Sequence, residues 1–100
     1  MNDIDINVNE DNYIEFVNYL YSINYITKND NERLVNWYTD VNDYFQKEYN
    51  SYEYRLFFDR KEWDIIACCC GGSEFFKKVT FINNLKELEV YMNCLKMGLL

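Results

Sequence analysis

The clearest hydrophobic pattern in the chain lies in its second half. In the run Tyr52–Asp59, aromatic and apolar residues occupy alternate positions, which is typical of a half-buried strand. A second apolar run covers residues 63–70, and a third alternating run covers residues 75–83. The breaks at 59–62 and 71–73 are short enough for hairpin turns. These runs predict a three-stranded antiparallel sheet.

Apolar residues at helical spacing flank this predicted sheet on both sides. They predict a first helix from about residue 9 or 12 to residue 23, a second over about residues 30–49, and a third from residue 84 to a stop at Gly98. Each predicted helix has an asparagine as N-cap and a glutamate three residues later, in the pattern of a capping box. The predicted caps are Asn12, Asn29 and Asn84.

The first eight residues alternate only weakly between apolar and polar. The sequence leaves open a tail or a short edge strand. We interpret the segment as a poorly ordered start, whose only regular contact would be pairing with an edge of the sheet. The predicted order is therefore α-α-β-β-β-α. It corresponds to a single α+β domain over residues 1–100, with the three-stranded antiparallel sheet packed against helices.

The net charge of −7 belongs entirely to the N-terminal half of the chain. Residues 1–50 contain three basic and ten acidic side chains, whereas residues 51–100 contain seven of each. A strongly negative field disfavours direct binding to nucleic acid or an anionic membrane and favours a basic protein surface. Acidic residues also keep a domain soluble, and the sequence leaves both explanations open.

The chain lacks the residues that most enzyme and metal sites use. It has no histidine, which removes the commonest general base and zinc ligand. The run Cys68–Cys70 alternates in direction along a strand, so it predicts small apolar strand residues in a reducing cell rather than a metal site. Gly71–Ser73 lacks the remainder of a phosphate-binding loop. We therefore expect a protein that is not an enzyme and has no cofactor or metal.

Targeting signals are likewise missing from the sequence. The acidic start has no apolar segment of a signal peptide, and the longest uninterrupted apolar run is far too short to span a bilayer. Fourteen asparagines and no proline indicate a genome rich in A and T, such as that of a low-GC bacterium, its mobile elements or a virus. We expect the protein in the cytoplasm of the host cell, with no membrane association.

Acidic residues on the two N-terminal helices are the candidate partner-binding groups, and three tyrosines at the edges of the apolar stripes are the candidate aromatic anchors. In size, acidity, asparagine and tyrosine content and element pattern, the chain resembles phage-encoded anti-CRISPR proteins and other anti-defence inhibitors. The resemblance implies carboxylates that occupy the DNA-binding groove of a nuclease. The candidate residues are Glu10, Asp11, Glu15, Glu32, Asp40, Asp43, Tyr21, Tyr25 and Tyr49.

Two functions from different classes therefore remain open. The first is a non-enzymatic inhibitor that docks its acidic helical half on a basic, nucleic-acid-binding protein such as a CRISPR-type nuclease and blocks access of nucleic acid. The alternative is a structural or self-associating module, a homodimer without a nuclease target, which the high apolar content of the sheet favours. An enzyme would require carboxylates from two elements to converge in a pocket.

Overall fold

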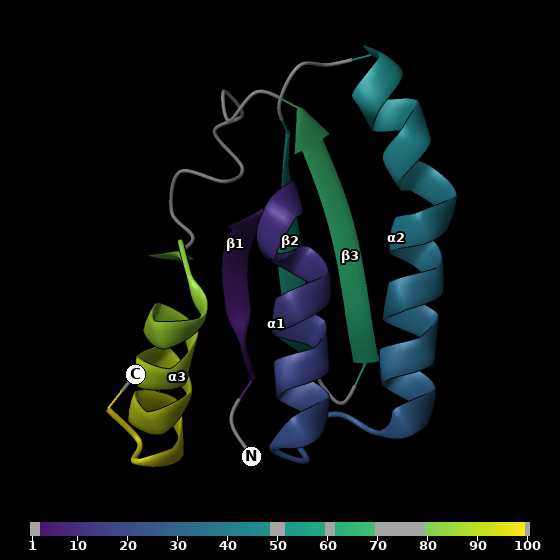
Figure 1. Ribbon diagram of the computed structural model, residues 1–100. Coiled ribbons are helices and arrows are strands. Elements are labelled where there is room, and N and C mark those ends of the chain that lie inside the picture. The colour runs from purple at the N-terminus through teal and green to yellow at the C-terminus, as the bar shows by residue number, and fades with distance from the viewer. Residues whose placement is uncertain (1–2, 49–51, 60–61, 70–79, 100) are drawn as a thin grey trace.

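The computed structural model describes residues 3–48, 52–59, 62–69 and 80–99 of the chain. It has an α+β fold in which three helices pack on one mixed sheet (Figure 1). The fold class predicted from the sequence is therefore confirmed, but the chain begins with a strand rather than a helix. The elements are β1 (Asp5–Asn9), α1 (Glu10–Ser22), α2 (Lys28–Glu48), β2 (Tyr52–Asp59), β3 (Glu62–Cys69), β4 (Thr80–Phe81) and α3 (Leu85–Lys96).

The sheet has the strand order β3-β2-β1-β4, which differs from the predicted three-stranded meander. The predicted hairpin of β2 and β3 is confirmed, with Tyr52 opposite Cys69 and Asp59 opposite Glu62. The described part of the third predicted strand does contain a strand, Thr80–Phe81, but its predicted antiparallel place in the meander is wrong, because it pairs with β1, in parallel. The first part of that predicted strand, residues 75–79, lies outside the described residues, and residues 82–83 follow the end of β4.

The N-terminal segment is an interior strand, so the expectation of a poorly ordered start or edge strand was wrong. β1 lies between β2 and β4, and the side chains of Ile4, Ile6 and Val8 are completely buried. Ile6 stands opposite Leu56 and Val8 opposite Tyr54, which are also buried. The apolar face of β1 is thus completed by residues about fifty positions away, which is why its own short pattern looks weak.

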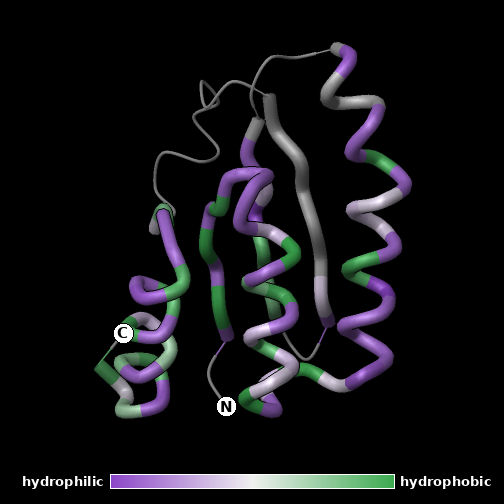
Figure 2. Tube along the Cα trace, in the orientation of Figure 1, coloured by the Kyte–Doolittle hydropathy of each residue, from purple (hydrophilic) through white to green (hydrophobic). Residues whose placement is uncertain are grey.

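The three helices form a layer over the sheet. Figure 1 shows α1 in front of β1 and β2, with α2 on one side of it and α3 on the other, and α1 contacts both neighbouring helices. Hydrophobic and hydrophilic segments alternate along β1 and α1 in Figure 2, as expected for elements with one buried face. The core lies between this helical layer and the sheet.

The predicted apolar stripes of the helices are largely confirmed. In α1 the side chains of Tyr13, Phe16, Val17 and Leu20 are buried, but Ile23 lies beyond the helix and is 39% exposed. In α3 the buried residues are Leu88, Met92 and Leu95. In α2, Leu34 is buried and Trp37, Tyr38 and Val41 are partly buried against the core.

Two of the predicted helix caps were placed too far along the chain. The side chain of Asn9, not Asn12, caps α1, and its Oδ1 accepts a hydrogen bond from the Asn12 amide at 3.2 Å. At the start of α2, Thr27 rather than Asn29 has this role. The Thr27 hydroxyl accepts from the Asp30 amide at 3.1 Å, and the Asp30 carboxylate accepts from the Thr27 amide at 3.2 Å. Thr27 and Asp30 thus form a reciprocal capping box.

The third predicted cap is confirmed. The side chain of Asn84 accepts a hydrogen bond from the Glu87 amide at 2.9 Å, and α3 begins at the next residue after Asn84. Glu87 in turn accepts from the amide of Asn83 at 2.7 Å. Two of the backbone donors at this end of α3 are therefore satisfied by side chains.

Candidate protein-binding surface

Hydrogen bonds and stacked rings hold α1 and α2 together as an antiparallel helical hairpin. The Tyr13 hydroxyl donates to the Leu34 carbonyl at 2.8 Å, and its ring stacks on Tyr38 with centroids 4.8 Å apart. The Tyr38 hydroxyl donates to the Glu10 carbonyl at 3.2 Å. These contacts lie between the two helices, so they fix the side of each helix that faces away from the sheet.

Five of the six predicted acidic residues lie on that outward side. Asp11 and Glu15 on α1 are exposed, and they lie opposite the buried stripe of the helix. Glu32, Asp40 and Asp43 on α2 are exposed in the same way. We call these five residues the acidic surface. At the boundary of the two helices the Asn31 side-chain amide donates to the Asn18 side-chain oxygen at 3.0 Å, which joins the two parts of this surface.

Glu10 occupies a different environment from the other predicted acidic residues. It is the first residue of α1, and its side chain is partly buried. Its Oε2 atom is inaccessible to solvent and has no hydrogen-bond partner among the described residues. The structure therefore separates Glu10 from the acidic surface, although a carboxylate in this first turn still interacts favourably with the helix dipole.

The predicted aromatic anchors are also in different environments. Tyr21 is 41% exposed near the end of α1. Tyr25 packs edge-on against Phe58 and Trp63, with centroids 5.7 and 5.8 Å away, and burial raises the pKa of its hydroxyl above the ordinary value. Tyr49 lies outside the described residues. Tyr21 is thus presented at the surface, whereas Tyr25 is partly built into the core.

A shallow, open hollow on the flank of α2 adds an aromatic group that the sequence did not single out for binding. Trp37 lies at helical spacing from the buried Leu34, as expected for a core residue, and it contacts the ring of Tyr54 edge-on at 5.6 Å. It is only partly buried, however, and its remaining surface lines the hollow. Its place on the hydrophobic side of the predicted helix concealed this exposed edge. The lining residues are Asn29, Asp30, Glu32, Arg33, Asn36, Trp37 and Asp40.

The charges of the hollow are mixed rather than purely acidic. Asp30 is engaged in the cap of α2, and the Arg33 guanidinium donates to the Trp63 carbonyl at 3.1 Å. Glu32 and Asp40 line the hollow as well and also belong to the acidic surface. The carboxylates suit a cationic side chain of a partner, which gains from the opposite charge.

A smaller apolar groove of about 190 Å³ lies between the ends of α1 and α3. Exposed apolar residues near these helix ends include Ile23 and Met97, the latter 71% exposed. No pattern in the sequence predicted this groove, because its two walls come from opposite ends of the chain. The lining residues are Tyr19, Ile23, Met92, Asn93, Leu95 and Lys96.

Comparisons with known proteins do not identify a family for this chain. No protein-family model matches the chain, and neither does any curated protein or solved structure. Among the described residues, no group of three or more cysteine, aspartate or glutamate side chains is arranged to hold a metal ion. None of the helices in the same part of the chain is both long enough and apolar enough to cross a membrane.

Proposed function

We propose that the protein is a non-enzymatic inhibitor that docks its acidic surface on a basic, nucleic-acid-binding protein. A CRISPR-type nuclease is the target class that best fits the resemblance in size, charge and element pattern. Docking would block the access of nucleic acid to the basic groove of that target, in the cytoplasm of the host cell. The observation that carries the proposal is the exposure of five carboxylates on one side of one helical hairpin.

The charge balance of the hairpin supports a basic partner. Residues 10–48 contain eight acidic and three basic side chains, so the hairpin alone has a net charge of −5. One of the three cations, Arg33, already donates to a backbone carbonyl of β3. Complementary charge across an interface accelerates association and excludes partners of the same sign.

The fixed position of the hairpin supports an inhibitor that binds without rearranging. The hydroxyls of Tyr13 and Tyr38 lock the two helices to each other, and the Tyr13 ring also contacts Tyr54 of β2. A preorganised surface loses less entropy on binding than a flexible one. Trp37, which lines the same hollow as Glu32 and Asp40, and the exposed Tyr21 of α1 are aromatic groups of the kind that supply most of the affinity at interfaces.

The direct test is competition with nucleic acid on a purified, guide-loaded CRISPR nuclease. Binding of the nuclease to labelled target DNA is measured by fluorescence anisotropy as the protein is added. The wild-type protein should lower the fraction of bound DNA, and the effect should weaken as salt is raised towards about 1 M, where charges are screened beyond ~3 Å. If the protein competed with DNA on none of the nucleases in a panel, the proposal would be wrong.

Two charge-reversal variants locate the binding surface. The triple change Glu32→Lys, Asp40→Lys and Asp43→Lys places like charge against a basic groove and should abolish competition. The matched control reverses three exposed acidic residues outside the hairpin: Asp3, Glu62 and Glu89. It alters the net charge equally and should keep most of the activity. Equal loss in both variants would mean that total charge matters and the acidic surface does not.

A further inference from the structure

The strand β3 forms one outer edge of the sheet, and the hydrogen-bond pattern shows which of its backbone groups point outwards. The Phe58 amide donates to the Ile4 carbonyl at 2.9 Å, so Phe58 and alternate residues of β2 direct their backbone groups towards β1. Arg55 therefore bonds to β3, where it stands opposite Ile66. The residues of β3 whose N–H and C=O groups point away from the sheet are consequently Trp63, Ile65, Ala67 and Cys69.

An independent contact agrees with this assignment. The Trp63 carbonyl accepts a hydrogen bond from Arg33 of α2 at 3.1 Å, as an outward-pointing group can do. That contact caps the beginning of the β3 edge. The stretch that follows, residues 65–69, contains no charge, proline or glycine.

β3 lacks most of the devices with which soluble proteins protect an exposed sheet edge, which are charged residues, proline, a bulge, a very short strand, or a covering helix or loop. The described part of β4, at the opposite edge, comprises Thr80–Phe81. β3 has eight residues. α2 contacts β3, and its Arg33 covers the outward carbonyl of Trp63 at the beginning of the strand, but no charged residue or proline interrupts the second half. In the described part of the chain no strand pairs with the outer side of β3.

We propose that two copies of this chain pair antiparallel through β3, so that the two sheets become one across a two-fold axis. An antiparallel strand is complementary to itself, and a two-fold axis lets the same surface serve on both sides. With the axis at Ala67, each Ala67 exchanges both backbone hydrogen bonds with its counterpart in the second copy. Ile65 of each copy exchanges its bonds with Cys69 of the other.

The cap on Trp63 selects this register. Moving the axis by one residue would place Ile65 opposite Ala67 and Trp63 opposite Cys69, which requires the Trp63 carbonyl that Arg33 already occupies. The register centred on Ala67 leaves that contact intact. A register centred on Asp64 is disfavoured as well, because like charges directly opposite each other destabilise strand pairs.

Dimerisation should depend on salt in the opposite way to binding of the proposed inhibitor to its partner. Each copy has a net charge of −7, so two copies repel each other at low salt. Dimerisation should therefore strengthen as salt rises to about 1 M, whereas docking on a basic partner should weaken. The dimer does not depend on the proposed function, and each can fail without the other.

Sedimentation velocity over a range of protein and salt concentrations tests the dimer. The wild-type chain should associate to a dimer, and Ala67→Pro should raise the dimer dissociation constant about tenfold or more, because it removes the N–H groups at the axis. Proline is tolerated on an edge strand where its nitrogen faces outwards. Ala67→Val, which adds similar bulk but keeps the N–H, should still dimerise. A wild-type chain that stays monomeric at every salt concentration, or an Ala67→Pro variant that dimerises as the wild type does, overturns the proposal.

Amide hydrogen exchange on the wild-type protein provides a second measurement that does not depend on any variant. The amides of Ile65, Ala67 and Cys69 should become protected as protein concentration rises. The amide of Ile66, which bonds to β2, should be protected at every concentration. Exchange of the three outward amides that is independent of concentration would contradict strand pairing, even if the chain dimerised through another surface.

Discussion

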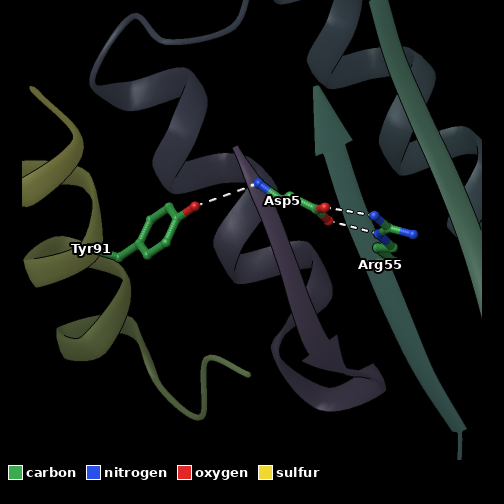
Figure 3. A network of polar contacts seen from close by, with 3 residues as sticks. All are labelled: Asp5, Arg55 and Tyr91. Carbon is green, nitrogen blue, oxygen red and sulfur yellow. Dashed lines mark hydrogen bonds and ion pairs between the residues drawn. The ribbon is translucent and has the colours of Figure 1, made fainter. Parts of the chain in front are cut away.

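Asp5 and Arg55 form a bidentate ion pair although they lie fifty residues apart in the sequence. The Arg55 Nε donates to Asp5 Oδ1 at 2.7 Å and its Nη2 to Asp5 Oδ2 at 2.6 Å. The Asp5 amide also donates to the Tyr91 hydroxyl at 3.5 Å, so one residue of β1 contacts both β2 and α3 (Figure 3). The hydrogen bonds to Asp5 raise the pKa of Arg55, which keeps the guanidinium charged. One carboxylate from the acidic half of the chain is thus paired with a cation from the neutral half.

This pair should contribute measurably to stability. We expect a double-mutant cycle of Asp5→Ala and Arg55→Ala to give a coupling energy of about 1 kcal/mol, at the upper end for partly exposed pairs because the geometry is bidentate. Arg55→Lys should lose most of this coupling, since an ammonium group cannot make the fork-shaped contact. Urea denaturation provides the free energies. Additive effects of the two alanine substitutions would show that the pair contributes nothing.

The interior position of β1 predicts a large cost for truncating its side chains. Ile6 is completely buried opposite Leu56, so Ile6→Ala should lower the free energy of unfolding by about 2–5 kcal/mol. Ile23→Ala removes the same atoms from a partly exposed site and should cost about 1 kcal/mol or less. Thermal and urea denaturation measure both. If Ile6→Ala destabilised the protein as little as Ile23→Ala, β1 would be a peripheral strand, as the sequence pattern predicted.

Substituting Gly98, just after the end of α3, should lower the stability of the protein because of its backbone conformation. Gly98 has φ +75°, and the amides of Gly98 and Leu99 donate to the carbonyls of Leu95 and Cys94, which is the Schellman pattern. A Cβ at Gly98 would meet no atom within 4 Å, so any cost comes from the left-handed backbone and not from a clash. Gly98→Ala should destabilise by about 1 kcal/mol.

Asparagine provides the matched control at this position. The equivalent residue after α1, Asn24, has φ 62° and is the only described non-glycine residue with a positive φ. Asparagine tolerates this region better than alanine does, so Gly98→Asn should cost less than Gly98→Ala. Chemical denaturation of the two variants gives the order, and the reverse order would refute the backbone explanation.

Buried tyrosines predict a loss of stability in alkaline solution. Burial raises the pKa of the Tyr13 hydroxyl above its ordinary value of 10.0, because the charged form would lose its hydration. The folded state therefore holds this proton more tightly than the unfolded chain. Stability from this group is fully present below pH 10 and should fall as the pH rises above it.

Melting temperatures measured from neutral pH to well above 10 test this prediction. The wild-type curve should decline once Tyr13 ionises in the unfolded chain, and ionisation of the buried Tyr13 should accompany unfolding. Tyr13→Phe should make the decline shallower, although loss of the hydrogen bond to Leu34 should cost about 1 kcal/mol at neutral pH. An unchanged slope in Tyr13→Phe would show that another group controls the alkaline transition.

Much of the local structure was determined by the sequence itself. The stripe that includes Phe16 and Leu20 predicted α1, the alternation around Leu56 predicted β2, and Asn84 predicted the start of α3. Helix periodicity, strand alternation and hairpin turns depend on residues close together in the chain, so a local pattern is sufficient to predict them. The exposure of Glu32, Asp40 and Asp43 followed from the same periodicity.

Strand order and the sharing of surfaces were decided only by the tertiary structure. The five-residue strand β1 has too little pattern of its own, and its place became fixed when Ile6 and Val8 met Leu56 and Tyr54. The parallel pairing of Thr80–Phe81 with β1 also joins opposite ends of the chain. Such pairings depend on which distant apolar faces match and on the closure of long loops. The sequence of a short segment predicts neither of these. For the same reason, only the folded hairpin could show that the acidic residues of α1 and α2 share one surface, and that Glu10 lies apart from them.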